Sequence, residues 1–545
     1  MASIAPPKKA NKIFFIAAFA IMLSMAFYQC YQTTHDLQWA SDPDFDRDIG
    51  FVQGTLNGHY GADPNYKGEY LWYNPLLFSV EAMIAKASSL PLNIVVTRAG
   101  AYINILAPVC FFIMAISLFG FDVALAALLS FLFLASGNIL GWGAATFTPW
   151  LYPVCFTQFL FYLNIILCYK AFSAEKYVWF VLLGTFIGIS FLGHTAPALL
   201  IILIMISVQS QKILRSFKKK DYLLLRKYLV QGIVAFVFFI IAAMPLLYYV
   251  VGKYHLHLVN RATFEYTEGI FILSNFKAMI KANLSVSFVV ACIGFIWFYK
   301  NFQHALIRRI IFSWLIFSVL MYMYSTFVAT MHNKFHIKLP GTVPSFHYFF
   351  YLKALQSLFF GLGFMFLIKK LIELVGSKMN QIRTDYISYI VVATVLVCSF
   401  IYFPFYKNRN DFVLLREQAL AKQDQKDKIE VYHFILDNIP EDKVILCDKD
   451  PSIFPVMATA RKMVSIAFTF SNPYLDFGKR EDDRNNMISF LKTGEPAEAK
   501  KLFADYETDF VLLANDDFGR LKMDSSFLGS TVFKNQSFSI FSVKK

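Results

Sequence analysis

The segment from Tyr31 to Pro75 reads YQTTHDLQWASDPDFDRDIGFVQGTLNGHYGADPNYKGEYLWYNP and is a polar interruption between two long apolar runs. Its acidic residues are closely spaced, with Asp42, Asp44, Asp46 and Asp48 alternating with Pro43, Phe45 and Arg47. Carboxylates this close repel one another, so a bound cation, a proton or a substrate hydroxyl group would stabilise them. Helix capping is the alternative explanation, because Asp is favoured at helix starts. Arg47 can pair with a neighbouring carboxylate or with a substrate phosphate.

The composition indicates a polytopic membrane protein. Of the 545 residues, 57% are hydrophobic and only 16% are charged, which is far more apolar than a soluble domain. The net charge of +14 comes from basic residues that flank apolar runs, as expected for loops retained on the inner side of the membrane, and it does not indicate nucleic-acid binding. The seven cysteines form no CxxC motif and predict no disulfide framework.

The first apolar run, Ile13 to Tyr31, follows three lysines and is long enough to cross the ~30 Å hydrocarbon core. It lacks a small-residue cleavage site, so we expect a retained anchor with the N-terminus inside. Ten further runs bring the prediction to about eleven spans. They cover residues 92–118, 123–136, 150–169, 177–193, 196–208, 228–251, 284–299, 310–328, 347–368 and 386–403. The odd number of spans and the basic inner loops place the C-terminal tail outside, on the side of the acidic loop.

Two domains are expected. Residues 1–405 form the transmembrane domain, with an outer loop at 32–91 that carries amphipathic helices over 47–56 and 76–90. Leu77, Val80, Ile84 and Ala87 are the expected apolar face of the second helix. The tail, 406–545, alternates helix and strand patterns and predicts an α/β domain with central strands at 444–447 and 510–513.

Some outer-face segments are basic, against the usual distribution of charge. Residues 252–283 contain Lys253, His255, His257 and Arg261, and residues 329–346 contain His332, Lys334, His336 and Lys338. His194 stands at a span end in GHTAP, where an ionisable group indicates either function or the capping of a broken helix. Each of these side chains can alternatively extend towards lipid headgroups.

The order of these features resembles the GT-C superfamily of integral membrane glycosyltransferases. At the level of motifs the resemblance rests on Asp36 to Leu76 and, more weakly, on TPWLYP (148–153), GHTAP (193–197) and VPSFH (343–347). It implies a bacterial enzyme of the inner (plasma) membrane, similar to arabinosyl- and mannosyltransferases, with a periplasmic C-terminal domain. Such an enzyme moves a sugar from a polyprenyl-phosphate donor to a glycan, lipid or protein acceptor.

The resemblance also implies roles for residues. Asp46 is the expected catalytic base, with Asp48 or Asp44 as the second acid. Asp36 and Asp48 remain alternatives for the base, because the family's acidic pair usually follows the first span directly, where Asp36 stands. The departing phosphate needs cations, and the expected ones are Arg47, Lys253, His255, Arg261, His332, His347 and His194.

A divalent cation and a different activity are also considered. Asp44, Asp46 and Asp48 can be expected to hold Mg²⁺ or Mn²⁺, which some members of the family use. The alternative function is a transporter or flippase of polyprenyl-linked sugars. Such a protein should carry ionisable residues near the middle of its spans and often two similar halves, and neither is evident in the sequence.

Overall fold

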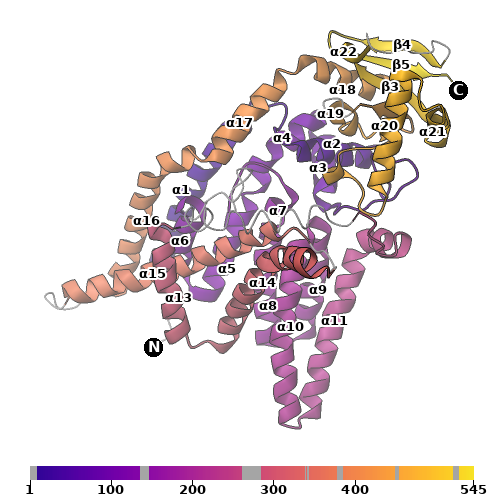
Figure 1. Cartoon of the computed structure of the whole chain (residues 1–545). Coiled ribbons are helices and arrows are strands. Elements are labelled where there is room, and N and C mark those ends of the chain that lie inside the picture. Colours follow the sequence, from indigo (N-terminus) through magenta and orange to yellow (C-terminus); the bar gives the residue numbers. More distant parts are fainter. Residues whose placement is uncertain are drawn as a thin grey trace. The chain divides into compact units, whose positions relative to one another are not determined.

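The computed structural model describes residues 9–134, 146–260, 284–337, 339, 343–376, 384–448, 453–518 and 527–544 (Figure 1). The chain divides into two compact units. The first contains Met1–Asp36, Arg98–Met244 and Thr263–Leu414, and the second contains Leu37–Thr97, Pro245–Ala262 and Leu415–Lys545. The tail thus forms one unit with the first loop, and the predicted boundary at residue 406 falls within α16 (Thr384–Lys407).

The first unit is helical because its segments are apolar over lengths that can span a bilayer. Among the residues that the structure describes, eight helices are long and apolar enough to cross a membrane, and three apolar helices are shorter. These eleven coincide with the predicted runs; whether all eleven cross remains a prediction. The helices of this unit are α1 (Lys9–Thr34), α5 (Leu106–Phe119), α6 (Phe121–Leu129), η1 (Ser130–Leu134), α7 (Pro153–Phe156), α8 (Gln158–Ala174), α9 (Tyr177–Gly193), α10 (Thr195–Lys218), α13 (Val286–Asn301), α14 (Ala305–Phe335), η3 (Ser345–Tyr348), α15 (Phe349–Gly376) and α16. Three further helices contain a unit boundary and belong to both units: α4 (Leu92–Ile103), α11 (Tyr222–Leu247) and α17 (Asn410–Gln423).

Helices α13 and α15 approach each other closely at two glycines. A Cβ atom on Gly294 would lie 1.8 Å from the carbonyl oxygen of Phe359, and one on Gly363 would lie 2.1 Å from that of Val290. Helices in a membrane gain little from the hydrophobic effect when they associate, because lipid tails are also apolar. Small residues at a crossing let the two backbones pack closely, which stabilises the helix pair. This helix pair therefore tolerates no larger side chain at these two positions.

The second unit contains a five-stranded sheet with the order β2-β1-β3-β5-β4, whose C-terminal strands are yellow in Figure 1. Strand β1 is parallel to β2 and β3, and β5 is antiparallel to β3 and β4. The predicted strands at 444–447 and 510–513 are confirmed as β1 and part of β3. The elements are α2 (Pro43–Leu56), α3 (Leu76–Ser88), η2 (Tyr248–Lys253), α18 (Lys426–Asn438), β1 (Val444–Cys447), α19 (Ile453–Met457), β2 (Lys462–Met463), η4 (Phe468–Phe470), α20 (Phe477–Thr493), α21 (Ala499–Asp505), β3 (Thr508–Ala514), α22 (Asn515–Phe518), β4 (Leu528–Lys534) and β5 (Phe538–Val543).

The Asp63-Pro64 turn ties the first loop to this sheet. One oxygen of Asp63 accepts hydrogen bonds from the backbone amides of Asn65 (2.8 Å) and Tyr66 (3.1 Å), and the other accepts from Asn472 (3.0 Å). The backbone amide of Met463 in β2 donates to the carbonyl of Asn65 at 2.7 Å. The ring of Tyr66 is fully buried in the core that covers one face of the sheet. The turn is therefore a structural part of the α/β unit.

The buried face of α3 differs from the predicted one. Leu77 is buried as expected, but the other buried residues are Phe78, Glu81, Ala82 and Ala85. The expected positions Val80 and Ile84 are only partly buried, and Ala87 is exposed. The periodicity alone could not distinguish these faces, because apolar residues occupy both and one core position is an acid.

Candidate functional site

Helix α2 begins inside the acidic row. Asp42 is its N-cap, and the side chain accepts a hydrogen bond from the backbone amide of Asp44 at 2.9 Å. Pro43 occupies the first turn, where its missing N–H costs nothing. The capping interpretation is therefore correct for Asp42. The three acids that follow project from a helix and lie in different surroundings.

Asp46 is buried, with 3% of its surface exposed, and forms an ion pair with Lys422. The ammonium group donates to both carboxylate oxygens, at 2.6 and 2.7 Å. Lys422 also lies 4.5 Å from the centre of the Phe454 ring. Burial raises the pKa of Asp46 to about 6, although the Lys422 charge opposes the shift. A carboxylate with this pKa can exchange a proton near neutral pH.

Asp48 is also buried and is held by Arg47. The guanidinium group donates to one oxygen of Asp48 from Nε (2.8 Å) and Nη2 (2.7 Å), and to Asp44 from Nη1 (3.2 Å). It lies over the ring of Tyr73, 4.6 Å from its centre. Burial raises the pKa of Asp48 to about 7 against the attraction of Arg47. The second oxygen of Asp48 has no hydrogen-bond partner among the described residues.

Glu81 on α3 is a third buried acid. It is 0% exposed, and neither carboxylate oxygen has a hydrogen-bond partner in the described parts of the chain. Burial raises its pKa well above the usual value, and the charge of Asp48 raises it further. Asp48 and Glu81 thus form a buried acidic pair in which the unfavourable repulsion is relieved when one of them carries a proton.

Asp36 lies in different surroundings. It follows α1 directly, belongs to the first unit, and its side chain is 45% exposed. The ring of His35 lies 3.8 Å from its carboxylate. The three candidates for the base therefore differ clearly: Asp46 is paired with lysine, Asp48 is paired with arginine, and Asp36 is accessible to solvent.

The acids do not fit a metal site built from Asp44, Asp46 and Asp48. Both oxygens of Asp46 are occupied by Lys422, and one oxygen each of Asp44 and Asp48 is occupied by Arg47. Within the described ranges there is no group of three or more His, Cys, Asp or Glu side chains that could hold a metal ion. These oxygens therefore serve ion pairs with Lys422 and Arg47.

Two of the predicted histidines meet in the first unit. His194 joins α9 to α10 and accepts a hydrogen bond from the backbone amide of Ala196 at 3.2 Å. His347 lies in η3, and its Nδ1 is 2.9 Å from the carbonyl of Pro344. The ring centres of His194 and His347 are 4.7 Å apart. The GHTAP and VPSFH motifs, 150 residues apart in the sequence, thus contact each other.

The other predicted cations are distributed over both units. Lys253 in the second unit is exposed and lies 5.2 Å from the centre of the Tyr70 ring. His255 is exposed and has a left-handed backbone, with φ of 51°. His332 is in the last turn of α14 in the first unit. Arg261 lies outside the described residues.

The third weak motif, TPWLYP, is held by a buried ion pair. Arg409 donates to both oxygens of Asp411, at 2.8 and 2.5 Å. Thr148 donates to Asp411 at 3.0 Å, and the indole of Trp150 donates to the Asp411 carbonyl at 2.6 Å. In this structure the motif makes packing and anchoring contacts.

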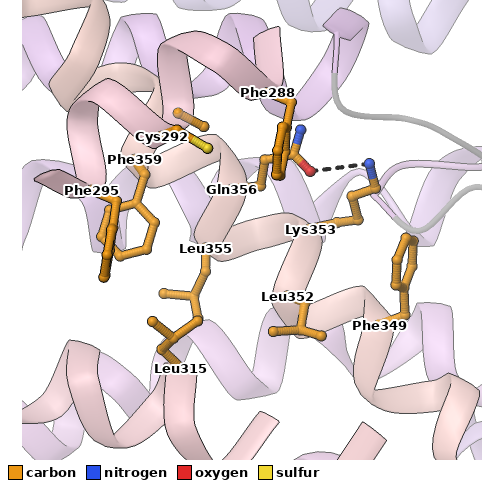
Figure 2. Close-up of a pocket in the computed structure, with 11 residues that line it drawn as sticks. Phe288, Cys292, Phe295, Leu315, Phe349, Leu352, Lys353, Leu355, Gln356 and Phe359 are labelled. Atoms are coloured by element: carbon orange, nitrogen blue, oxygen red, sulfur yellow. Dashed lines mark hydrogen bonds between the residues drawn. The ribbon is translucent and has the colours of Figure 1, made fainter. Parts of the chain in front are cut away.

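A lysine that sequence reasoning missed is buried in α15. Lys353 is 3% exposed and donates to the side-chain oxygen of Gln356 at 3.1 Å. Lys353 lines a pocket of about 350 Å³ whose walls are mostly phenylalanine and leucine. Figure 2 shows its ammonium group directed at the side chain of Gln356. A lysine is costly inside a membrane span, which could have marked this position. Lys422 and Glu81 gave no comparable signal, because the pairing of Lys422 with Asp46 and the burial of Glu81 are set by the tertiary fold.

Comparison with solved structures identifies the class of fold. No family model matches the sequence, and no curated protein matches it. ArnT from Cupriavidus metallidurans in the apo state is 11% identical and superposes with a TM-score of 0.56 over 98% of each chain. The Archaeoglobus fulgidus oligosaccharyltransferase tethered with an acceptor peptide is 12% identical, with a TM-score of 0.51 over 93% of this chain and 69% of that one. The chain therefore has a polytopic fold of the GT-C type, and the predicted resemblance is confirmed at the level of the fold.

Proposed function

We propose that the protein is a membrane glycosyltransferase that moves a sugar from a polyprenyl-phosphate donor to an acceptor outside the membrane. The observation that carries this proposal is the fold shared with ArnT over nearly the whole of both chains. ArnT from Cupriavidus metallidurans was also solved bound to undecaprenyl phosphate, and that structure superposes with a TM-score of 0.54 at 12% identity. The buried acids on α2 supply groups suited to the chemistry.

In the proposed reaction, an acceptor hydroxyl oxygen forms a bond to the anomeric carbon of the donor sugar. The bond between that carbon and the phosphate oxygen breaks, and the lipid phosphate leaves with the electron pair. A carboxylate takes the hydroxyl proton, which makes the oxygen a better nucleophile. Cations stabilise the charge that develops on the phosphate.

Asp46 is the proposed proton acceptor, with Asp48 and Asp36 as alternatives. A pKa of about 6 supports Asp46, although an acceptor hydroxyl must share the carboxylate with Lys422. An oxygen without a partner supports Asp48. Exposure to solvent supports Asp36.

For the phosphate, we propose the His194 and His347 pair of the first unit. Lys253, His255, His332, Arg261 and Arg47 stay individual candidates from the sequence. The contact between the two histidine rings favours the first pair, because it joins two motifs of the GT-C resemblance. Arg47 is the weakest of these, since three of its nitrogens already donate to acids.

The test is transfer from a polyprenyl-phosphate sugar by purified protein, with donor affinity measured separately. Asp46→Asn keeps the shape but removes the basicity, so turnover should fall by ~10² or more while donor binding persists. His347→Ala should instead weaken donor binding. Near-normal turnover in Asp46→Asn with loss in Asp48→Asn or Asp36→Asn would assign the base to that residue. Normal turnover in all three would refute the mechanism.

A transporter of polyprenyl-linked sugars is the second candidate, and Lys353 is the observation that favours it. A buried lysine beside an apolar pocket within a membrane helix is a feature of substrate pathways. Its place in the second turn of α15, near a span end, fits a pathway through the membrane centre less well. Movement of the lipid-linked sugar across vesicles that is lost in Lys353→Leu, without any transfer to acceptors, would support this alternative.

A further inference from the structure

A cleft of about 470 Å³ lies within the second unit, and the acids of α2 that are proposed for catalysis are not among its lining residues. Its walls come from the end of α2, the loop after it, η2, and the segments that precede β1 and β2. This volume is in the range of small-ligand sites. All of its lining residues belong to one compact unit.

Tyrosine rings form much of the cleft. Tyr60 is 45% exposed and Tyr70 is 37% exposed. The rings of Tyr70 and Tyr249 are stacked, with centres 6.1 Å apart and planes 25° apart. The hydroxyl of Tyr249 rests on Gly61, where a Cβ atom would lie 2.0 Å from it and the φ of 99° favours glycine. These contacts hold the rings of Tyr70 and Tyr249 in fixed positions at the cleft.

Hydrogen-bonding groups lie between these rings. The hydroxyls of Tyr60 and Tyr249 and the carboxylate of Asp442 make no hydrogen bond to another described residue. One oxygen of Glu441 is 2.8 Å from His59 Nε2, which leaves the other oxygen to accept a further bond. Carboxylates and phenol oxygens accept hydrogen bonds from hydroxyl groups.

The charge balance disfavours an anionic ligand. Four acids line the cleft, Asp63, Glu69, Glu441 and Asp442, against two lysines, Lys67 and Lys462, and His59, which is paired with Glu441. Lys67 is paired with Glu507 at 2.6 Å, and Lys462 donates to the carbonyls of Asp63 (2.7 Å) and Pro64 (3.1 Å). A phosphate or sulfate group would therefore meet mostly negative charge.

An extended peptide is also disfavoured. Peptides commonly bind by adding a strand to an open sheet edge. The edge strand beside the cleft is β2, and its Met463 amide already donates to the carbonyl of Asn65 at 2.7 Å. The ligand must therefore be recognised by side chains, through apolar ring faces and acceptors of hydroxyl hydrogens.

We propose that this cleft binds an uncharged saccharide. The apolar C–H faces of sugar rings pack on Tyr60, Tyr70 and Tyr249, and sugar hydroxyls donate to Asp442 and Glu441. The binding of a saccharide does not depend on the proposed function. The further statement that this saccharide is the acceptor glycan of the transfer reaction rests on the proposed function.

The test is saturation-transfer NMR on the full-length protein in lauryldimethylamine oxide, because detergents with sugar head groups would occupy the cleft. The probes are mannotetraose, arabinotetraose and maltotetraose, with glucose 6-phosphate and tetra-alanine for comparison. We expect signals from at least one tetrasaccharide and none from the last two. Affinity should fall tenfold or more in Tyr60→Ala and Tyr249→Ala, and stay unchanged in Tyr222→Ala, an exposed tyrosine of the first unit.

Absence of signals from all three tetrasaccharides would overturn the proposal, as would stronger signals from the phosphorylated sugar or the peptide. Equal affinity in the two cleft variants and the control would also overturn it. No donor is present in this experiment, so its failure is distinct from that of the proposed function. Saccharide binding without transfer would reject the transferase alone, and transfer without saccharide binding would reject the cleft alone.

Discussion

The ion pair between Lys422 and Asp46 allows a quantitative test of the second unit. Lys422→Met removes the charge but keeps much of the side-chain length in a site where both residues are less than 10% exposed. Asp46 then loses its two hydrogen bonds from the ammonium group. Leaving one member of a buried pair without compensation costs about 3–5 kcal/mol. At about 2–4 °C per kcal/mol for a unit of 150–250 residues, Tm should fall by roughly 6–20 °C.

The loss should depend on pH. Burial already raises the pKa of Asp46 above its usual value, and removal of Lys422 raises it further. An acid with a raised pKa in the folded state stabilises the protein below its unfolded pKa, and this stability is lost as pH rises through the folded value. Lys422→Met should therefore be close to wild type at pH 5 and clearly less stable at pH 8.

Thermal unfolding of the purified protein at these two pH values provides the measurement. The double variant Lys422→Met with Asp46→Asn should recover most of the loss at pH 8, because no buried charge remains. Lys426→Met, at an exposed position, is the matched control and should leave Tm unchanged within about 2 °C. An equal loss at both pH values, or no recovery in the double variant, would refute the reasoning.

Three other predictions concern different parts of the chain. Between pH 5 and 8 the free energy of unfolding should fall less in Glu81→Gln than in the wild type, because a buried acid with a raised pKa destabilises the fold as it ionises. Denaturant titration at the two pH values measures this difference. Arg409→Leu should lower Tm by roughly as much as Lys422→Met, since Asp411 loses its cation, whereas the exposed Arg226→Leu should not. Ser530→Cys, in exposed β4, should react with an impermeant maleimide in intact cells, and protection would reject an outer C-terminal tail.

The positions of the apolar helices could be predicted because transfer into a bilayer depends on local composition. The same holds for β1 and β3, whose apolar runs are buried on both faces. The partner of Asp46 could not be predicted, because Lys422 lies 376 residues away and has no distinguishing sequence context. The burial of Glu81 could not be predicted for a related reason. Helical periodicity identifies the buried face of a helix only when the polar residues lie on the other face.

The acidic row shows how a helix changes the meaning of a sequence pattern. Four acids at alternate positions look like one cluster, but successive residues of an α-helix are about 100° apart. Residues four apart share a side, so Asp44 and Asp48 contact Arg47 while Asp46 reaches Lys422. The row is divided between two cations, which is why it fits two separate ion pairs and not a shared metal ion.

The contrast between a buried ion pair in the first unit and a buried acidic pair in the second indicates which groups can take part in chemistry. In the first unit both oxygens of Asp411 accept hydrogen bonds from Arg409, and Thr148 adds another, as expected of a structural pair. In the second unit Asp48 and Glu81 together leave three buried oxygens without partners among the described residues. Such oxygens cost stability unless they are protonated or receive a ligand. A fold that retains these oxygens on α2 and α3 keeps acids ready to exchange protons, which is what the proposed transfer requires.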